Sequence, residues 1–547
     1  MQGAILAVAG MLTRVIGLAY RIPMNNILGD EGQGFYGVAF EIYSIALLLT
    51  SYSLRLAVSK LVSARKAKGD RNGVIKVFKT AIIFALTVGG AVALIVFFGA
   101  DAIATKIMSM HLSVYALRVL APGLFIVAIL GVLRGFFQGM GTMVPTAFSQ
   151  ILEQIVNAVI SLVAASYFFK VGAKAMAKAK DAASGNLSGA YGAAGGTLGT
   201  VAGATIALIF LLWLLFMMRR PLRGYRRAAA DQEEAYGTLF KILLLTIAPV
   251  IMSTAIYNIS QVLDQAIFAK TMSIQGVAEE KYSALLGMFS GKYNTLINVP
   301  LAIANALAVS VIPSLTAEKV HGRRADMFSK MALAIRFAMI VAIPSFIGYL
   351  VLAHPVIDLL YSGNINTPAL MLRIGSVSVV FYCLSTVTNA LLQGIDRMMT
   401  PVKNAAISLF IHLISLLIML IVFHLSIYGV VIANIVFSLC MCLLNQRSIR
   451  MYTGYQQELR KTFVIPLIAA VIMGLITFLA YRLFVYLQLG LFATIPAMIV
   501  AVISYMIALL ALGGLTRPEI LQMPGGARLV RILDRFHLLR RPTDITD

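Results

Sequence analysis

Apolar runs of about twenty residues recur along the whole of this 547-residue chain. A helix of about 20 apolar residues spans the roughly 30 Å hydrocarbon core of a bilayer. Reading for such runs predicts fourteen membrane-spanning helices. Their expected spans are 4–28, 36–63, 75–99, 112–137, 144–169, 191–218, 239–269, 282–312, 328–353, 366–392, 402–423, 427–447, 462–486 and 489–513. Because 60% of the residues are hydrophobic and only 12% are charged, a soluble fold is excluded. We therefore expect an all-α polytopic membrane protein.

Basic residues gather between these apolar runs. The main clusters are Arg65, Lys66, Lys68 and Arg71 after the second span, Arg219, Arg220, Arg223, Arg226 and Arg227 after the sixth, Arg323, Arg324 and Lys330 after the eighth, Arg447 and Arg450 after the twelfth, and Arg528, Arg531, Arg535, Arg540 and Arg541 in the tail. With fourteen spans these clusters share one side, which the positive-inside rule makes cytoplasmic. Both termini are then cytoplasmic. This topology accounts for the net charge of +23, so we expect no nucleic-acid partner.

One basic cluster disagrees with this topology. Lys170, Lys174, Lys178 and Lys180 follow the fifth span and would lie outside. They begin a Gly/Ala/Ser-rich loop that we expect to end near Gly196. Either this loop is a tolerated exception, or the fifth or sixth span is wrong. We keep the exception, because an odd number of spans would move every later basic cluster outside.

An internal repeat divides the chain into two halves. Leu117 to Gly139 reads against Leu372 to Gly394, with Leu-Arg at the start and Gln-Gly at the end of both segments. An even number of spans in each half predicts a parallel repeat about an axis along the membrane normal, with a site near the midplane between the halves. We expect two pseudo-symmetric six-helix lobes and two further helices. The expected divisions are 1–220 (N-lobe), 221–238 (basic cytoplasmic linker), 239–450 (C-lobe), 451–513 (helices 13 and 14) and 514–547 (basic cytoplasmic tail).

Two arginines interrupt the first apolar run. Arg14 and Arg21 are seven residues apart, so they share one helix face at a separation of roughly 10 Å. An arginine at mid-membrane costs about 2.5–3.5 kcal/mol on insertion scales. Two arginines on one face therefore indicate a wet or anionic surrounding rather than lipid. In the alternative interpretation, one arginine extends to the nearer interface and the other pairs with a carboxylate.

Other polar residues inside the predicted spans extend this candidate site. The expected substrate-binding residues are Arg14, Arg21, Arg55, Lys292, Asn294 and Asn298. Three more residues are expected either to couple an ion or to balance the charge of the cations, and these are Glu41, Gln261 and Asp264. The two asparagines could equally hold helices together through hydrogen bonds. Arg55 could instead lie at the cytoplasmic interface.

The sequence does not indicate an enzyme or a metal site. Gly32 to Gly37 fits a dinucleotide-binding pattern, but it joins two predicted membrane helices rather than a strand and a helix. There is no P-loop, and no His/Cys/carboxylate cluster has metal-ligand spacing. We expect no catalytic residue, no metal and no cofactor, with coupling to Na⁺ or H⁺ left open. A membrane-embedded glycosyltransferase would need a sizeable external loop, and the longest one, near 170–190, has Asp181 as its lone carboxylate.

Several short motifs resemble one transporter family. They are Tyr20-Arg21-Ile22-Pro23, Ile27-Leu28-Gly29-Asp30-Glu31-Gly32, Ala57-Val58-Ser59-Lys60-Leu61-Val62, Asn298-Val299-Pro300, Val311-Ile312-Pro313-Ser314, Ala353-His354-Pro355-Val356-Ile357-Asp358-Leu359-Leu360 and Leu392-Gln393-Gly394. They make the chain similar to the bacterial polysaccharide transporters of the stage V sporulation protein B branch. This branch belongs to the multidrug/oligosaccharidyl-lipid/polysaccharide (MOP) exporter superfamily, which includes the lipid II flippase MurJ. The resemblance implies fourteen helices in two lobes around a central cavity, with a lipid-tail groove formed by the last two helices.

The same resemblance implies a function. We expect a flippase, not an enzyme, that exports an undecaprenyl-pyrophosphate-linked saccharide, first of all the peptidoglycan precursor lipid II, across the bacterial cytoplasmic membrane. Alternating access would be driven by the membrane potential, an ion gradient or both. The expected partners are the lipid-linked saccharide, membrane lipids and the cell-wall synthesis machinery, and the protein is expected to be a monomer. Two alternatives stay open: a flippase for another unit (teichoic acid, capsule or spore cortex), and a multidrug or cation exporter of the same superfamily.

Overall fold

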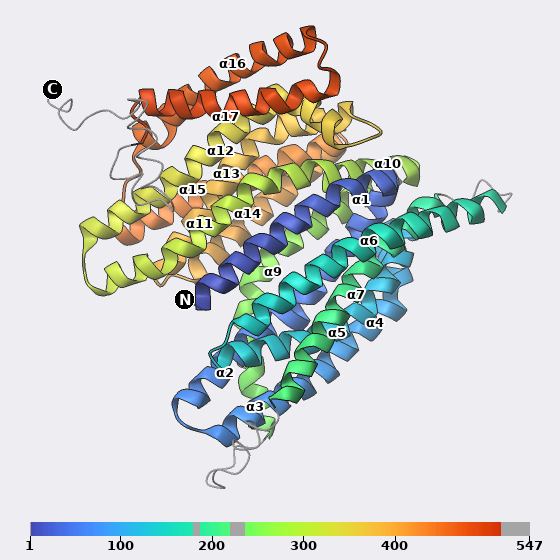
Figure 1. Cartoon of the computed structure of the whole chain (residues 1–547), viewed down its shortest axis with the longest axis vertical. Coiled ribbons are helices and arrows are strands. Elements are labelled where there is room, and N and C mark those ends of the chain that lie inside the picture. The colour runs from blue at the N-terminus through green and yellow to red at the C-terminus, as the bar shows by residue number, and fades with distance from the viewer. Residues whose placement is uncertain (1, 179–185, 219–235, 516–547) are drawn as a thin grey trace. The chain divides into compact units, whose positions relative to one another are not determined.

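A computed structural model describes residues 2–178, 186–218 and 236–515 of the chain (Figure 1). All of the regular structure in these ranges is helical. Eleven of the helical segments described there are long and apolar enough to cross a membrane. The protein is therefore a multi-pass helical membrane protein, as expected from the sequence. The count of fourteen membrane helices stays a prediction.

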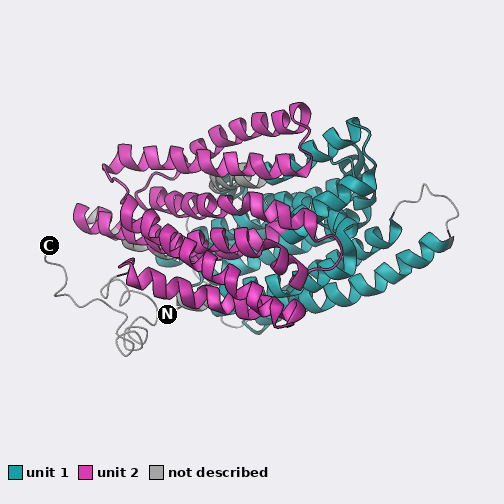
Figure 2. Cartoon of the chain, turned by 90° about the horizontal axis from the view of Figure 1, so that it is seen from above, with its two compact units in different colours: residues 1–292 teal, residues 293–547 magenta. Residues whose placement is uncertain are grey.

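The chain divides into two compact units, of which unit 1 ends at Lys292 (Figure 2). The helices of unit 1 are α1 (Gln2–Leu47), η1 (Leu48–Tyr52), α2 (Ser53–Ala67), α3 (Arg71–Phe84), η2 (Ala85–Gly89), α4 (Gly90–Ala102), η3 (Ile103–Ile107), η4 (His111–Ser113), α5 (Val114–Gly139), α6 (Val144–Lys178), α7 (Leu187–Met217), α9 (Tyr236–Ile274), α10 (Glu279–Gly287) and most of η6 (Met288–Tyr293). Helix α1 packs against α5, α6, α7, α9 and α10. It is therefore the central helix of this unit.

Helix α1 is sharply bent at Gly29. The backbone there has φ 69° and ψ 175°, a conformation that favours glycine. Residues 21 and 40 would lie about 28 Å apart along a straight helix, yet Arg21 Cζ lies 5.9 Å from the centre of the Phe40 ring. The two halves of α1 therefore bend back toward each other. The segment 29–35, which joins the first two predicted spans, is therefore helical except at the bend at Gly29.

Close approaches between helices explain the glycine-rich sequence of α7. A Cβ atom added at Gly195 would lie 2.4 Å from the carbonyl oxygen of Ala164 on α6. One added at Gly203 would lie 2.5 Å from the carbonyl oxygen of Glu153 on the same helix. Small residues spaced four apart allow membrane helices to pack this closely. These contacts fix α6, with its polar residues, against α7.

Unit 2 begins at Tyr293. Its helices are α11 (Asn294–Val320), α12 (Arg324–Leu360), α13 (Asn366–Gly394), α14 (Met399–Leu417), η7 (Ile418–Val422), α15 (Ile427–Thr453), η8 (Arg460–Val464), α16 (Ile465–Tyr486), η9 (Gly490–Ala493) and α17 (Thr494–Ala511). Helix α13 packs against α11, α12 and α15, and α16 packs against α12 and α17. Helix α13 thus takes the central place in this unit.

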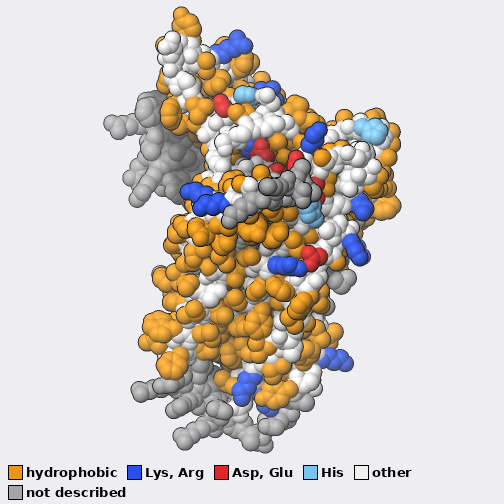
Figure 3. Space-filling model, turned by 90° about the vertical axis from the view of Figure 1, so that its right-hand side faces the viewer, with side chains coloured by type: hydrophobic (Ala, Val, Ile, Leu, Met, Phe, Trp, Pro, Cys, Tyr) orange, Lys and Arg blue, Asp and Glu red, His pale blue; other side chains and the backbone are white. Residues whose placement is uncertain are grey.

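The outer helices carry exposed apolar side chains. Apolar side chains cover much of the face in Figure 3. On α16, Leu475 and Leu479 are 63% and 66% exposed, and on α17 Val502 is 65% exposed. In water such a surface would be strongly unfavourable, whereas lipid tails solvate it. These faces are suited to contact lipid.

The connection between α6 and α7 is shorter than expected from the sequence. Lys170 and Lys174 lie on α6, which continues to Lys178, and α7 already begins at Leu187. The loop expected to end near Gly196 is therefore shorter, and Lys180 lies outside the described residues. The predicted linker 221–238 also lies largely outside them. The repeat-based lobes stay a prediction, because the compact units instead divide after Lys292.

Candidate functional site

The first cation of the candidate site, Arg21, lies in a polar cluster of unit 1. Its side chain is partly buried and hydrogen-bonds to Tyr20. Glu41, on the other half of α1, interacts with Arg21 and with Asp264 of α9. The bend at Gly29 is what brings residues 21 and 41 together. Glu41 is therefore the carboxylate that faces Arg21, which favours the charge-balancing role for Glu41, and Asp264 lies beside Glu41.

Tyrosine and asparagine side chains continue this cluster toward α6 and α7. Tyr36 is buried beside Tyr20 and Thr200 of α7. Asn157 of α6 is buried and donates to the Tyr20 hydroxyl at 3.4 Å. Ser161 donates to Asn157 Oδ1 at 2.9 Å. Buried polar groups in a membrane protein need such partners. This network fixes the orientation of α1 next to Arg21.

Lys292, the second expected cation, is fully buried. Its Nζ lies 2.6 Å from Oδ1 of Asp30, which directly follows the bend of α1. The contact requires small residues, since a Cβ at Gly287 would lie 1.7 Å from the Asp30 carbonyl oxygen and one at Gly34 would lie 2.1 Å from that of Ser283. Gly34 and Gly287 therefore allow α10 to pack closely against α1. In this conformation a ligand would reach Lys292 only if the ion pair opened.

Arg55 belongs to a second group of charges, on α2, α5 and α6. Arg134 of α5 is buried, and its Nη2 lies 2.6 Å from Oε2 of Glu153 while its Nε donates to Ser149 Oγ at 3.0 Å. Arg55 is partly buried and interacts with both Arg134 and Glu153. Its Cζ lies 5.7 Å from the centre of the Tyr52 ring. Two guanidinium groups thus share one carboxylate in this group.

The remaining predicted residues are not all brought together. Arg14 is exposed on α1, and Gln261 is exposed on α9, whereas Asp264 is buried. Asn294 is partly buried and Asn298 is exposed, but both belong to unit 2. Within unit 1, the structure therefore groups Arg21, Glu41 and Asp264, and separately adds partners to Arg55 and Lys292.

Sequence reasoning missed two of these partners. Arg134 lies inside the predicted span 112–137, and an ionisable residue there is a signal for a functional or paired charge. Asp30 falls between the first two predicted spans, so the sequence does not indicate that it pairs with a cation inside the membrane. Its partner Lys292 lies 262 positions away in the sequence. The sequence around Asp30 therefore gives little indication of this ion pair.

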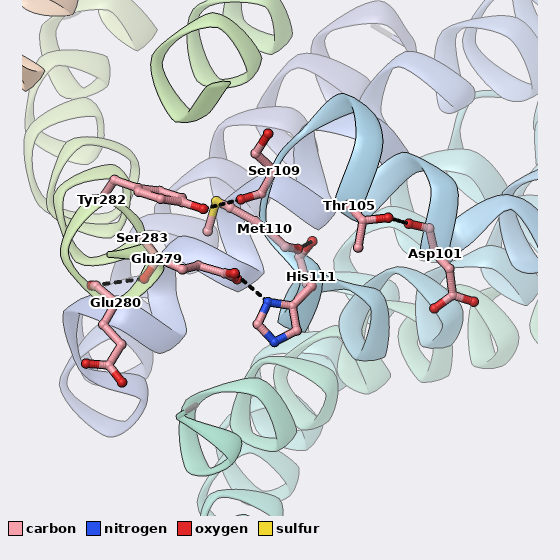
Figure 4. Close-up of polar contacts among 10 residues, drawn as sticks. Asp101, Thr105, Ser109, Met110, His111, Glu279, Glu280, Tyr282 and Ser283 are labelled. Carbon is pink, nitrogen blue, oxygen red and sulfur yellow. Dashed lines mark hydrogen bonds and ion pairs between the residues drawn. The ribbon is translucent and has the colours of Figure 1, made fainter. Parts of the chain in front are cut away.

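The N-terminal end of α10 is fixed by polar contacts with the turn before α5 (Figure 4). His111 Nδ1 and a carboxylate oxygen of Glu279 are paired, and the Tyr282 hydroxyl donates to the carbonyl oxygen of Ser109. Ser283 also donates to the carbonyl oxygen of Glu280 at 3.1 Å. Within the described ranges, no group of three or more His, Cys, Asp or Glu side chains could hold a metal ion. These contacts hold α10 in place beside Asp30 and Lys292.

A known protein family matches this sequence. The model of the polysaccharide biosynthesis protein family matches residues 2–319, which is more than half of the chain. The chain belongs to this family. It is 24% identical over 407 residues to stage V sporulation protein B of Bacillus subtilis (strain 168), covering 74% of each chain. It is 25% identical over 492 residues to the lipid II flippase MurJ of the same organism, covering 86% of each.

Solved structures agree with this family at the level of fold. The inward-closed conformation of the lipid II flippase MurJ matches with a TM-score of 0.65 at 14% identity, over 92% of this chain and 97% of that one. An inward-facing MATE family multidrug resistance transporter of the MOP superfamily matches with a TM-score of 0.64 at 16% identity, over 83% and 98%. The family and fold confirm the expected MOP exporter branch. They also confirm the expectation of a transporter rather than an enzyme.

Proposed function

We propose that this family member is a flippase that moves an undecaprenyl-pyrophosphate-linked saccharide outward across the bacterial cytoplasmic membrane. Lipid II is the first candidate substrate, because the MurJ relative matches over 86% of both chains. We further propose that both termini are cytoplasmic, that the protein acts as a monomer, and that membrane lipids and the cell-wall synthesis machinery are its partners. The basic clusters on one side of the predicted spans support the orientation.

The observation that carries this proposal is the excess of cations around Glu153. Arg55 and Arg134 interact with this one carboxylate. An uncompensated arginine inside a membrane protein costs about 2.5–3.5 kcal/mol on insertion scales. A pyrophosphate would supply the missing anion, and the planar guanidinium groups of arginine match its oxygens in bidentate fashion. An exporter of cations would instead need a carboxylate-rich site.

We assign pyrophosphate binding to Arg14, Arg21 and Arg55, with Lys292 joining them only when Asp30 releases it. Asn294 and Asn298 are assigned to hydrogen bonds with the saccharide. The lipid tail would stay in the membrane, in a groove formed by α16 and α17, while the predicted lobes rock around the headgroup. Each negative charge that moves outward gains about 2.3 kcal/mol per 100 mV of interior-negative potential. Glu41, Gln261 and Asp264 would add Na⁺ or H⁺ coupling if they do more than balance charge.

Transport of fluorescent lipid II in proteoliposomes would test this function. We expect wild-type protein to move the lipid to the leaflet where an added enzyme or quencher reaches it. Arg21→Gln and Arg55→Gln should slow this movement at least tenfold. Arg118→Gln is the matched control, because Arg118 forms an exposed pair with Asp101 in the same unit. Equal rates in all variants would overturn the assignment of the arginines, and absence of lipid II movement by wild type would exclude this substrate.

The match to stage V sporulation protein B favours a second candidate, a flippase for a different lipid-linked saccharide. Teichoic acid, capsule and spore-cortex units on the same lipid carrier would present the same pyrophosphate to the arginines. The same vesicles loaded with each lipid would separate the candidates. Faster transport of another lipid, with the same dependence on Arg21 and Arg55, would keep the mechanism and replace the substrate.

A further inference from the structure

A cavity of about 350 Å³ lies within unit 2, apart from the arginines discussed above. It is lined by the end of α11, the start of α12, the connection after α13 and the end of α15. Its cationic lining residues are Lys319, Arg323, Arg324 and Arg397, and its one carboxylate is Glu318. A volume of this size suits a small ligand or the headgroup of a larger one.

The charge of this cavity is strongly positive. Glu318 is already bonded by Lys330, whose Nζ lies 2.6 Å from its Oε1. That hydrogen bond lowers the pKa of the Glu318 carboxyl below its usual value, so the carboxylate stays ionised and bound. Asp326 and Asp396 are neighbours in sequence but do not line the cavity. The four lining cations are therefore not matched by an equal number of lining carboxylates.

Two of the cations are held in place. The Cζ of Arg397 lies 4.4 Å from the centre of the Tyr452 ring, in a cation–π contact. Lys319 Nζ donates to the carbonyl oxygen of Ile395 at 2.5 Å. Two of the four cations that line the cavity therefore have defined contacts with other lining residues.

The start of α12 adds a further positive end. Arg323 occupies the N-cap position and Arg324 the first helical position, and no side chain caps the helix by a hydrogen bond. Arginine is a poor choice there, because the N-terminus of a helix already carries partial positive charge and prefers Asp, Asn, Ser or Thr. An anion in the adjacent cavity would satisfy both the helix end and the arginines. The first turn of α12 also contains Asp326, which does not line the cavity, so an anion there would add to a helix end that has no side-chain cap.

We propose that this cavity binds the phosphate group of an anionic phospholipid headgroup. The cavity residues follow the eighth, tenth and twelfth predicted spans, so the positive-inside topology places them on the cytoplasmic side. Basic pockets between membrane helices on that side are suited to anionic headgroups. A soluble phosphate compound would be recognised by the same chemistry, and the experiment has to separate the two sources.

Binding to three probes separates these possibilities. The full-length protein would be titrated with phosphatidylglycerol and with phosphatidylcholine in native mass spectrometry, and with inorganic pyrophosphate in calorimetry. We expect phosphatidylglycerol to bind more tightly than phosphatidylcholine. In the variant Arg324→Gln/Arg397→Gln this affinity should fall at least tenfold. Arg460→Gln/Lys461→Gln is the control with the same change in charge, since both residues are exposed and outside the cavity.

Two further variants make the result decisive. Arg324→Lys/Arg397→Lys keeps the charge and should retain most of the affinity, which separates loss of binding from loss of folding. Arg118→Gln, which removes an exposed cation of unit 1 outside the cavity, should leave it unchanged. If only pyrophosphate binds in a way that depends on the cavity residues, the cavity is a phosphate site, and the proposal that it binds a phospholipid headgroup is wrong. Equal losses in the cavity and control variants, or no loss in either, would overturn the proposal.

Discussion

Two groups of cations, Lys292 of unit 1 and the cavity residues of unit 2, are held in opposite ways. In unit 1 the side chain of Lys292 is 0% exposed, and Asp30 lies 2.6 Å away with 14% exposure. In unit 2 Lys330 is 36% exposed and bonds to Glu318, while Arg324 and Arg397 are exposed at the cavity. A cation removed from water needs its own carboxylate, because desolvation is expensive. An exposed cation is stabilised by water and stays available to a ligand.

The Arg134–Glu153 pair lies between these extremes, with side-chain exposures of 9% and 25%. Arg55 interacts with the same carboxylate. Charges in this group are buried enough to act in a low dielectric, where an ionic contact is strong, yet they are not matched one to one. The comparison teaches that the degree of burial and the ratio of charges, together, separate a structural cation from one that can bind a substrate.

The largest effect is expected from Asp30→Asn. This change leaves the buried Lys292 ammonium without its carboxylate, and breaking a buried pair costs about 3–5 kcal/mol. Thermal unfolding in detergent should show a large fall in Tm. The double variant Asp30→Asn/Lys292→Met removes both charges and should recover most of the loss. If the double variant is no more stable than Asp30→Asn, the ion pair is not what stabilises this contact.

A smaller effect is expected from Glu153→Gln. The amide keeps a hydrogen-bond acceptor for Arg134 but removes the charge, and the partly exposed site can be reached by water, so we expect a loss of about 1–3 kcal/mol. The same change raises the net positive charge near Arg55. Binding of a polyprenyl pyrophosphate, measured by native mass spectrometry, should therefore tighten while Tm falls. Weaker binding by this variant would contradict the proposed role of the uncompensated arginine.

The smallest effect is expected from Glu318→Gln, because Lys330 is 36% exposed and an ion pair that water reaches contributes little. The hydrogen bond from Lys330 lowers the pKa of the Glu318 carboxyl below its usual value of 4.5. Its stabilising contribution is therefore present above pH 4.5 and is lost as the pH falls through the pKa of the folded state. The difference in Tm between wild type and variant should be small at neutral pH and vanish in acid. A difference in Tm that grows as the pH falls would contradict the stabilising role of the ionised Glu318 carboxylate.

Much of the helix layout was predictable from the sequence. The span expected at 112–137 is α5, Val114–Gly139, and the one expected at 366–392 is α13, Asn366–Gly394. Both agree because bilayer thickness sets the length of an apolar run, and that length can be read locally. Helix ends that extend beyond the apolar core were less predictable. Lys170 and Lys174 thus continue α6 although they were expected in a loop.

The candidate site was predictable only in part. Arg21, Glu41 and Asp264 stood out as charges within apolar runs, and the structure brings them into one cluster. Arg134 carried the same signal and was overlooked. The partnership of Asp30 with Lys292 could not be read locally, because it depends on the bend at Gly29 and on glycines that let α10 approach α1.

The sequence by itself determined that this chain is a multi-pass helical membrane protein, because hydropathy sums over neighbouring residues. Only the tertiary structure decided which cations are paired and which share a carboxylate. That outcome depends on distances of a few ångströms between residues far apart in the chain. Arg55, Arg134 and Lys292 look alike as charges in the sequence, but burial and the number of nearby carboxylates give them different roles.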